Sequence, residues 1–333
     1  MKNQTDSKVM NHKTIDCDYT GWVKWHPADN DWGILESYGR KDINILKLRQ
    51  DFPECTMPKL YKNQYLLVYS TESGESKHIK TYFRDGDFLR VVARETIEYK
   101  PDKADAIKIS AYNDEQICAI NMLRADSSWD EKRRRSEGKT IKLITGRWGS
   151  GKTLLETAAA LEHLEDGRFD RIIWIRNNVD VKDTKDIGAL PGEAIDKLLP
   201  FLGPFIDHAG EDRVRCMISS GRLVVAPLNF LRGRNFKNSI IICSECENLT
   251  REHMQLIIAR AAGGTEVWFD GDSRQVDKPI FERDGGIAYV VNRFKGKPRF
   301  GYVHLTQCER SDTAAMADLL DLDYVDTDPE DCI

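Results

Sequence analysis

The sequence lacks the features that mark membrane proteins, strongly basic nucleic-acid-binding proteins and disulfide-stapled proteins. No apolar run approaches the roughly 18 residues that cross a bilayer, and residues 1–16 are polar with no hydrophobic signal core. Lysine and arginine together number 49 against 54 aspartates and glutamates, so the formal net charge is -5. We therefore expect a cytoplasmic protein without a membrane segment, in which any contact with nucleic acid uses local patches.

The eight cysteines do not show the spacing of a disulfide framework or of a zinc module. Cys243 and Cys246 form a C-x-x-C, but it lies inside the apolar segment IIICSEC, and no second pair accompanies it. We interpret the two residues as buried, reduced thiols, with a metal or redox role as the less favoured alternative.

The hydrophobic pattern divides the chain into two parts, and its 333 residues are enough for two domains. Residues 65–92 hold short β-rich runs separated by the turns TESGES and RDGD, which predicts a small antiparallel β module. From residue 140, apolar strand segments alternate with helical segments, which predicts an α/β fold with a mainly parallel sheet. We expect strands at 141–145, 171–176, 222–227, 239–243, 266–271 and 302–306, and helices at 152–164, 192–208 and 250–261.

The segment GRWGSGKT satisfies the phosphate-binding pattern G-x-x-x-x-G-K-[ST]. A predicted strand precedes it and a predicted helix follows it, so backbone N–H groups and the positive helix end can hold phosphates. In this pattern Lys152 reaches the β- and γ-phosphate oxygens and Thr153 ligates magnesium. The sequence therefore predicts a site for ATP and Mg2+. The residues expected to bind this cofactor are Gly146, Gly149, Ser150, Gly151, Lys152, Thr153 and Leu154.

A P-loop ATPase also needs a second strand that ends in acidic residues, one for the magnesium shell and one to activate water. The apolar segment IIICSE offers Glu245 as the candidate general base and magnesium-site residue. Ser244 stands just before it, where an aspartate is expected. Because a neutral hydroxyl is a poorer acceptor than a carboxylate, we expect weakened Mg2+·ATP binding and turnover.

The next predicted strand ends as WFDGDSRQVD, at the edge where open parallel sheets bind ligands. Its polar residues are Asp270, Asp272, Gln275 and Asp277, and Gln275 suits a sensor of the γ-phosphate. Arginines elsewhere in the chain are candidate phosphate or transition-state cations: Arg232, Arg234 and Arg310.

Taken in chain order, these segments resemble the PhoH-like ATPases. The matching blocks, between about residues 110 and 322, are GRWGSGKT, KDIGALPGEAIDKLLPFLGPFIDH, APLNFLRGRNFKNSIIICSECENLT, WFDGDSRQVD and ERSDTAAMADLL. Upstream, DYTGW at 18–22 and KLYKNQYLLVYSTES at 59–73 look like the connector of the two-domain PIN-PhoH branch. Since only residues 1–17 precede this connector, we expect no PIN nuclease domain in the chain.

The resemblance implies a RecA-like domain related to superfamily-one helicases, which assembles as a ring, often a hexamer, with ATP near the subunit boundaries. It implies that Lys152 and Thr153 bind phosphate and magnesium, that Glu245 is catalytic, and that Gln275 is the sensor. It also implies a finger-like role for Arg310.

Further roles follow from the same resemblance. Gln116 matches a glutamine that recognises adenine, and Arg176 matches a position that faces nucleic acid, with Arg232 and Arg234 as further candidates for that contact. The family usually has Asp-Glu-Ala-Gln-Asn where this chain has SECEN at 244–248. One carboxylate is thereby lost and another gained, at Glu247.

We therefore expect an α/β fold: a RecA-like P-loop NTPase core with a mainly parallel sheet, preceded by a small antiparallel β module. The expected domains are a polar tail at 1–17, a connector and small β module at 18–105, a PhoH-like RecA ATPase domain at 106–322 and an acidic tail at 323–333.

The leading functional hypothesis is an ATP-binding and ATP-hydrolysing protein that remodels or unwinds RNA as an oligomeric ring. Its expected partners are ATP, single-stranded RNA and copies of itself, with DNA as an alternative to RNA. A second hypothesis is a nucleotide-gated assembly scaffold with little hydrolysis, in which Ser244→Asp should raise turnover. A third is that the N-terminal module recruits a separately encoded nuclease or other partner.

Overall fold

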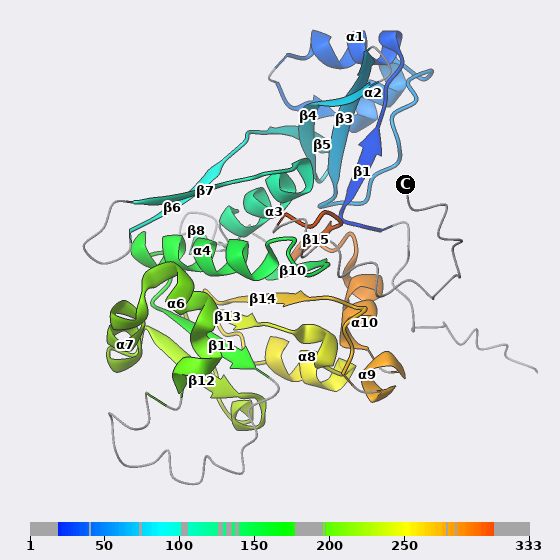
Figure 1. Ribbon diagram of the computed structural model, residues 1–333. Helices are drawn as coiled ribbons and strands as arrows, with labels where there is room; N and C mark the ends of the chain where they lie inside the picture. The colour runs from blue at the N-terminus through cyan, green and yellow to red at the C-terminus, as the bar shows by residue number, and fades with distance from the viewer. Residues whose placement is uncertain are drawn as a thin grey trace, which may run out of the picture.

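A central sheet flanked by helices forms the larger part of the protein, and a smaller sheet stands beside it (Figure 1). The computed structural model describes residues 19–39, 41–72, 75–100, 106–125, 129–130, 135–136, 140–176, 196, 198–277, 279–283 and 285–309. Arg310 and the expected acidic tail lie outside these residues. Among the helices that are described, none combines the length and the apolar composition needed to cross a membrane.

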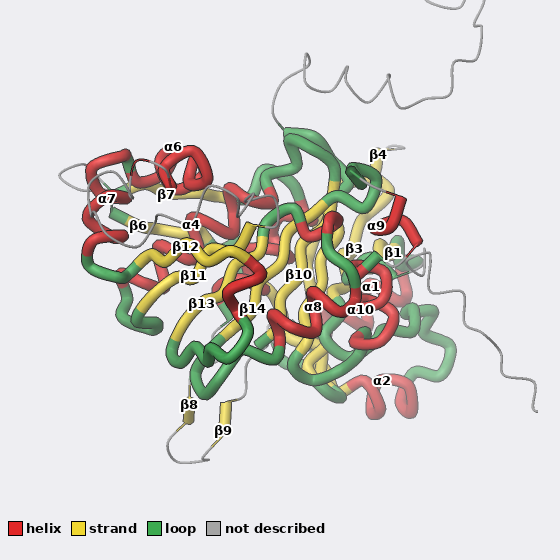
Figure 2. The backbone as a smooth tube through the Cα atoms, turned by 90° about the horizontal axis from the view of Figure 1, so that it is seen from below, coloured by secondary structure: helices red, strands yellow, loops and turns green. Residues whose placement is uncertain are grey.

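All strands of the central sheet run parallel, which confirms the predicted α/β fold class. β14 lies between the strand that leads into GRWGSGKT and the strand that leads into SECEN (Figure 2). The order across the sheet is β12 (Leu223–Pro227), β11 (Arg171–Arg176), β13 (Ser239–Cys243), β14 (Glu266–Gly271), β10 (Ile141–Gly146) and β15 (Phe300–Leu305).

Alternation of side chains along each strand gives the sheet two hydrophobic faces. In β13, Ile240 and Ile242 pack on one face, whereas Ile241 and Cys243 pack on the other. The first face is covered by α3 (Asp114–Arg124), α4 (Lys152–Glu165), α6 (Gly203–Ala209) and α7 (Glu211–Ser219). The second is covered by α8 (Arg251–Ile258) and α10 (Gly286–Phe294). Cys243 and Cys246 are buried free thiols, as predicted.

The other helical segments of the core are short. Within the predicted helix at 192–208, the described residues form the 3-10 helix η2 (Leu199–Leu202) followed by α6. Neither α7 nor α10 was expected from the hydrophobic pattern. The remaining elements are the 3-10 helices η3 (Leu228–Leu231) and η4 (Cys246–Asn248), the helix α9 (Pro279–Arg283), and the paired strands β8 (Trp129–Asp130) and β9 (Arg135–Ser136).

The predicted β module is present, and its sheet is antiparallel except at one edge. There β1 runs parallel to β3. β1 is not part of the predicted module, because the N-terminal stretch that contains it shows no sustained periodicity. The strand order is β1 (Trp22–Trp25), β3 (Tyr65–Glu72), β4 (Glu75–Asp85), β5 (Phe88–Val92) and β2 (Ile43–Asn44). Its own hydrophobic core includes residues of α1 (Asp29–Ser37) and α2 (Ile45–Asp51).

Two features join the module to the central sheet. Strands β6 (Thr96–Tyr99) and β7 (Ile107–Ser110) form an antiparallel pair across the expected domain boundary at residue 105. Residues 19–22 of the DYTGW segment run along β15, where the backbone N–H of His304 donates to Thr20 O at 2.9 Å and Trp22 Nε1 donates to His304 O at 2.8 Å. At Gly21, with φ +82°, an added Cβ would lie 1.8 Å from Tyr302 O, so only glycine fits.

A fully buried ion pair links the neighbouring strands β10 and β14 of the central sheet. Lys142 Nζ lies 2.7 Å from Glu266 Oε2, and neither side chain is exposed. The same ammonium donates to the backbone oxygens of Leu123 and Ala125 at 2.9 and 2.8 Å, and it lies 4.9 Å from the ring centroid of Trp268. Trp268 Nε1 in turn donates to Glu266 Oε2 at 2.6 Å. Because both charges are surrounded by partners, the pair fixes the register of the two strands and of the end of α3.

Replacing Lys142 with methionine should lower the free energy of unfolding by about 3–5 kcal/mol, because it leaves the Glu266 carboxylate buried without its cation. The matched control is Lys108→Met, which breaks the exposed Lys108–Glu98 pair and should cost less than about 1 kcal/mol. Urea denaturation followed by circular dichroism measures both. Equal, small losses in the two variants would contradict the role given to Lys142.

Candidate nucleotide site

The GRWGSGKT loop connects the carboxyl end of β10 to the first residue of α4. At Gly146, φ is +155° and an added Cβ would lie 2.3 Å from Leu305 O on the neighbouring strand. Gly151, with φ +90°, is the N-cap of α4. Glycine is required at position 146 because the backbone of β15 passes there. At the other end of the loop, the first N–H groups of α4 point into the loop.

The Lys152 ammonium lies inside the loop that it follows in the sequence. Its Nζ donates to the backbone oxygens of Gly146 and Arg147, both at 2.7 Å. Ser150 Oγ donates to the same Arg147 oxygen at 2.7 Å. Burial lowers the pKa of Lys152, whereas the carboxylates of Asp270 and others nearby act in the opposite direction. A cation is therefore held at the helix N-terminus, where phosphates are expected to bind.

The loop borders a cavity of about 550 Å³, which is also formed by the ends of β13 and β14, by β7 and by the η2–α6 segment. Most of the predicted site residues meet here, although they come from distant parts of the sequence. The predicted residues that line the cavity are Gln116, Gly149, Gly151, Lys152, Thr153, Leu154, Glu245 and Gln275. Gly146 and Ser150 shape the loop without lining the cavity.

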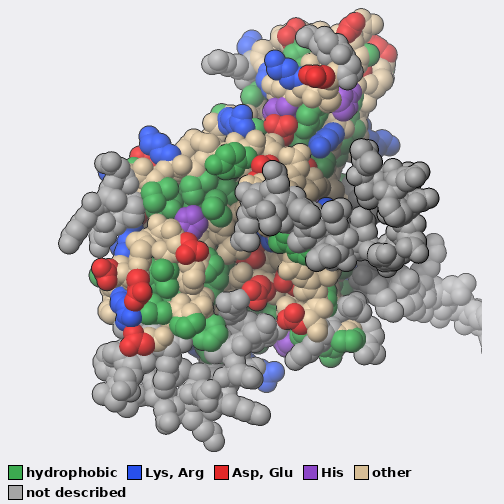
Figure 3. Space-filling model, viewed as in Figure 1, with side chains coloured by type: hydrophobic (Ala, Val, Ile, Leu, Met, Phe, Trp, Pro, Cys, Tyr) green, Lys and Arg blue, Asp and Glu red, His purple; other side chains and the backbone are tan. Residues whose placement is uncertain are grey.

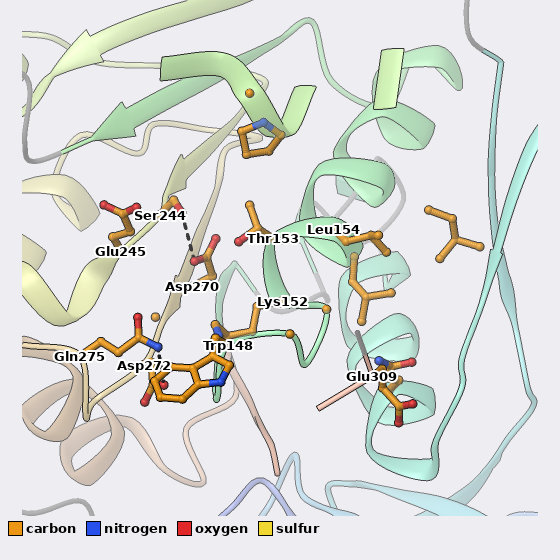
Figure 4. Close-up of a pocket in the computed structure, with 18 of the residues that line it drawn as sticks. Trp148, Lys152, Thr153, Leu154, Ser244, Glu245, Asp270, Asp272, Gln275 and Glu309 are labelled. Atoms are coloured by element: carbon orange, nitrogen blue, oxygen red, sulfur yellow. Dashed lines mark hydrogen bonds between the residues drawn. The ribbon is translucent and has the colours of Figure 1, made fainter. Parts of the chain in front are cut away.

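At the carboxyl ends of two adjacent strands, Ser244 and Asp270 are in contact. Ser244 Oγ donates to Asp270 Oδ1 at 3.1 Å, and in Figure 4 the hydroxyl of Thr153 faces the same carboxylate. Asp270 is only 2% exposed, and apart from the neighbouring Glu156 carboxyl its Oδ2 has no side-chain hydrogen-bond partner among the described residues. Burial raises the pKa of Asp270, and the Lys152 charge opposes that shift. The sequence predicts Asp270 at a ligand-binding edge, but no local pattern indicates its contact with Ser244.

Glu156, one turn into α4, does not line the cavity but lies beside Asp270, and no sequence motif points to it. Its side chain is fully buried, and neither carboxyl oxygen has a hydrogen-bond donor among the described residues. Burial, and then the neighbouring Asp270 carboxylate, raise the pKa of Glu156 well above its ordinary value. Glu156 and Asp270 share a side-chain hydrogen bond, and the raised pKa favours the protonated form of Glu156, whose O–H donates to the Asp270 carboxylate. The available signal was a glutamate four positions after Lys152, on the buried face of an apolar helix.

The acidic residues of SECEN take different positions. Glu245, at φ +56° in the left-handed region, is half-buried and lines the cavity, but Figure 4 shows its carboxylate directed away from Lys152 and Asp270. Glu247 is buried, and its Oε2 accepts from the backbone N–H of Asp272 at 3.1 Å. Burial raises the pKa of Glu247 to about 7, although its bonds to backbone N–H groups act against that shift.

The sensor candidate Gln275 is held by Asp272. Gln275 Nε2 donates to Asp272 Oδ2 at 3.0 Å, while Arg274 forms an ion pair with the same carboxylate at 3.4 Å. The Arg274 guanidinium also lies 5.6 Å from the ring centroid of Trp148, the bulky residue of the phosphate loop. Trp148 therefore packs against the loop that follows β14.

Gln116, on α3, forms a hydrogen bond to the phosphate loop. Its Nε2 donates to Ser150 O at 3.0 Å, and its Oε1 accepts from the backbone N–H of Tyr112 at 2.8 Å. Adenine recognition by Gln116 stays a prediction. It would use the second N–H of Nε2 and the second lone pair of Oε1. Tyr112, missed in the sequence, is 80% exposed and lines the cavity together with other apolar residues, namely Ile109, Leu154, Pro200 and Pro204.

The arginines predicted to contact phosphate or nucleic acid do not join this cluster. Arg232 and Arg234 are exposed and do not line the cavity, and Arg234 packs over the Phe236 ring. Arg176 ends β11, but its side chain lies outside the described residues, as does Arg310. On the described part of the face seen in Figure 3, lysine and arginine side chains are scattered and form no continuous stripe.

The last described residue before Arg310 contacts the phosphate loop. The backbone N–H of Glu309 donates to Gly149 O at 2.9 Å, and Glu309 Oε1 accepts from Asn113 Nδ2 at 2.6 Å. Glu309, which directly precedes the predicted finger-like arginine in the sequence, therefore lies at the cavity.

Comparison with known proteins agrees with the predicted resemblance. A family model described as PhoH-like protein matches residues 109–319. Protein PhoH2 of Bacillus subtilis is 29% identical over 326 residues, covering 93% of this chain and 67% of that protein. Protein PhoH2 of Mycolicibacterium smegmatis is 30% identical over 184 residues, covering 54% of this chain and 42% of that protein. The chain thus spans between about two fifths and two thirds of the length of these relatives.

Among solved structures, the Sulfolobus solfataricus SWI2/SNF2 ATPase core in complex with double-stranded DNA matches with a TM-score of 0.31 and 15% identity. The match covers 54% of this chain and 35% of that one. A likeness at this level carries no information about function.

Gln116→Ala should weaken the binding of ATP and GTP together, each by about fivefold, because one lost side-chain hydrogen bond that supports the loop is worth about 1 kcal/mol. Fluorescence titration with labelled ATP and GTP measures the two affinities. Tyr112→Ala is the companion variant, and it leaves the backbone N–H bond to Gln116 in place. A loss confined to ATP in Gln116→Ala would instead assign Gln116 to adenine recognition.

Proposed function

The chain belongs to the family of PhoH-like proteins, and on that premise we propose that it binds and hydrolyses ATP with Mg2+ in the P-loop cavity. We further propose that it uses this cycle to remodel or unwind single-stranded RNA as an oligomeric ring, with a hexamer as the expected size. The observation that carries the proposal is the phosphate loop itself: Lys152 at the N-terminus of α4, with Thr153 beside it, facing buried carboxylates across one cavity.

The cavity has the size and lining that ATP requires. Its volume of about 550 Å³ falls within the roughly 300–1,000 Å³ of ligand pockets. The phosphates fit the loop, where Lys152 supplies the ammonium and the α4 N-terminus supplies N–H groups. The adenine fits the apolar part of the lining, where the exposed ring of Tyr112 offers a stacking surface.

The residues present also fit a magnesium ion. Within the described residues no cluster of three or more His, Cys, Asp or Glu side chains could form a metal cage by itself. Mg2+ does not require one, because it binds through one or two carboxylates together with substrate phosphates and water. Thr153 and an acidic residue would hold it, and Glu245 is the sequence-based candidate. When bound, the ion polarises the phosphoryl oxygens.

For hydrolysis, Glu245 would accept a proton from the attacking water, and Gln275 would orient that water against the γ-phosphate. Arg310 would supply a transition-state cation. The Glu245 carboxylate must turn toward the phosphates to act, since it is directed away from Lys152 in this structure. Arg176, Arg232 and Arg234 remain the proposed nucleic-acid contacts, and DNA is the alternative to RNA.

A second function is favoured by one observation: Ser244 stands where the family has an aspartate. In this alternative the protein is a nucleotide-gated scaffold, whose ring ATP stabilises with little hydrolysis. The N-terminal β module, with its separate hydrophobic core, would then recruit a nuclease or another protein partner. This proposal treats the N-terminal module and the ATPase core as separate domains, divided at residue 105.

The proposed function is tested by steady-state ATP hydrolysis with and without single-stranded RNA. Lys152→Ala should lose RNA-stimulated turnover by at least about 100-fold, because removing a preorganised cation from a phosphoryl-transfer site costs that order of rate. The matched control is Lys47→Ala, an exposed lysine of α2 outside the cavity, which should turn over ATP like the wild type.

Outcomes separate the candidate functions. An unchanged rate in Lys152→Ala would contradict an ATPase at this site. Tight ATP binding by the wild type without turnover would support the scaffold. Turnover stimulated equally by single-stranded DNA would remove the preference for RNA.

A further inference from the structure

The carboxylate that the sequence lacks at Ser244 has a candidate on the next strand. Ser244 directly follows β13, whose residue Cys243 is paired with Phe269 of β14. The next position on β14 is Asp270. Adjacent parallel strands lie about 4.8 Å apart. Position 270 therefore lies one strand away from position 244, at the same level of the sheet.

The two side chains also share a face. Phe269 and Cys243 both pack on the α8–α10 side, so alternation turns Ser244 and Asp270 toward α4. Thr153, the predicted magnesium ligand, is the second residue of α4, and Figure 4 shows its hydroxyl facing Asp270.

The other carboxylates of the cavity are engaged or directed elsewhere. Asp272 accepts from Arg274 and Gln275, and Glu247 accepts from a backbone N–H. The carboxylate of Glu245 points away from the loop lysine. Asp270, in contrast, is only 2% exposed, lines the cavity next to Thr153, and shares its carboxylate only with the Ser244 hydroxyl, the neighbouring Glu156 carboxyl and the Glu245 backbone among the described residues.

We propose that Asp270, on β14, supplies the carboxylate of the magnesium shell that Ser244 does not supply from β13, and that the Ser244 hydroxyl positions it. This inference rests on the proposed ATP site. Ser244 donates to Oδ1, and in Figure 4 the other carboxylate oxygen lies toward the Thr153 hydroxyl. The serine is then a partner of the relocated carboxylate, and the departure from the family motif does not by itself abolish magnesium binding.

A consequence distinguishes this proposal from the scaffold hypothesis. If the site lacked its carboxylate, Ser244→Asp would restore it and improve magnesium-dependent binding. With Asp270 already in place, the same substitution brings two buried carboxylates into contact, and their repulsion disfavours the doubly charged form. Ser244→Asp alone should therefore weaken magnesium-dependent binding, and the exchange Ser244→Asp with Asp270→Ser should recover it.

The experiment is a titration of the full chain with a fluorescent ATP analogue, once with Mg2+ and once with EDTA. The ratio of the two affinities is the magnesium-dependent gain, a readout that does not depend on turnover. Asp270→Asn should reduce this gain by about 10- to 100-fold while leaving the affinity in EDTA unchanged or higher. Asp212→Asn, the same change at an exposed aspartate of α7 that does not line the cavity, should keep the wild-type ratio.

Circular dichroism of each variant separates misfolding from loss of the ion, and the exchange variant tests the proposal even where Asp270→Asn unfolds. An undiminished gain in folded Asp270→Asn, or a larger gain in Ser244→Asp alone, would overturn the role of Asp270. Failure of the exchange variant to exceed the gain of Ser244→Asp would also overturn it. Wild-type protein that binds no ATP under either condition would overturn the ATP site as a whole.

Discussion

The position of β14 between β10 and β13 is the constraint on which the site depends. Its pairing with β10 sets Asp270 beside Ile144, close to where the phosphate loop begins, and its pairing with β13 sets the same residue beside SECEN. The buried Lys142–Glu266 pair holds this register at the other end of β10 and β14. Because parallel strands end at a common edge, three chain segments far apart in the sequence bring their polar residues to one cavity.

Much of this arrangement could be predicted, because it follows from periodicity and from one local motif. The strands at 171–176, 239–243 and 266–271 have the predicted bounds, since a strand buried on both faces reads as a continuous apolar run. The β module was found for its turns, whereas β1 and α1 were missed because their burial depends on β3 and not on a local pattern. The order of the strands, and with it the contact of Ser244 with Asp270, is a tertiary property that neither segment encodes alone.

The loop is also held by groups that no motif includes. Gln116 reaches Ser150 from α3, and Glu309 reaches Gly149 from the segment after β15. Such bonds fix the loop before a ligand arrives, which reduces the conformational entropy that binding must overcome. The family resemblance assigns Gln116 to adenine recognition, whereas in the structure both ends of its amide are bonded to backbone atoms. Its role in the loop is visible only when α3 is seen against the core.

Residues 19–22 cover part of one edge of the central sheet. β15 is the outermost strand on that side, and its His304 exchanges hydrogen bonds with Thr20 and Trp22. An uncovered edge strand is a template for pairing with another chain. A fragment prepared by cutting the protein at residue 105 would therefore contain every predicted nucleotide-binding residue and yet expose β15, so protein engineering of the isolated core should retain these upstream residues or replace their hydrogen bonds.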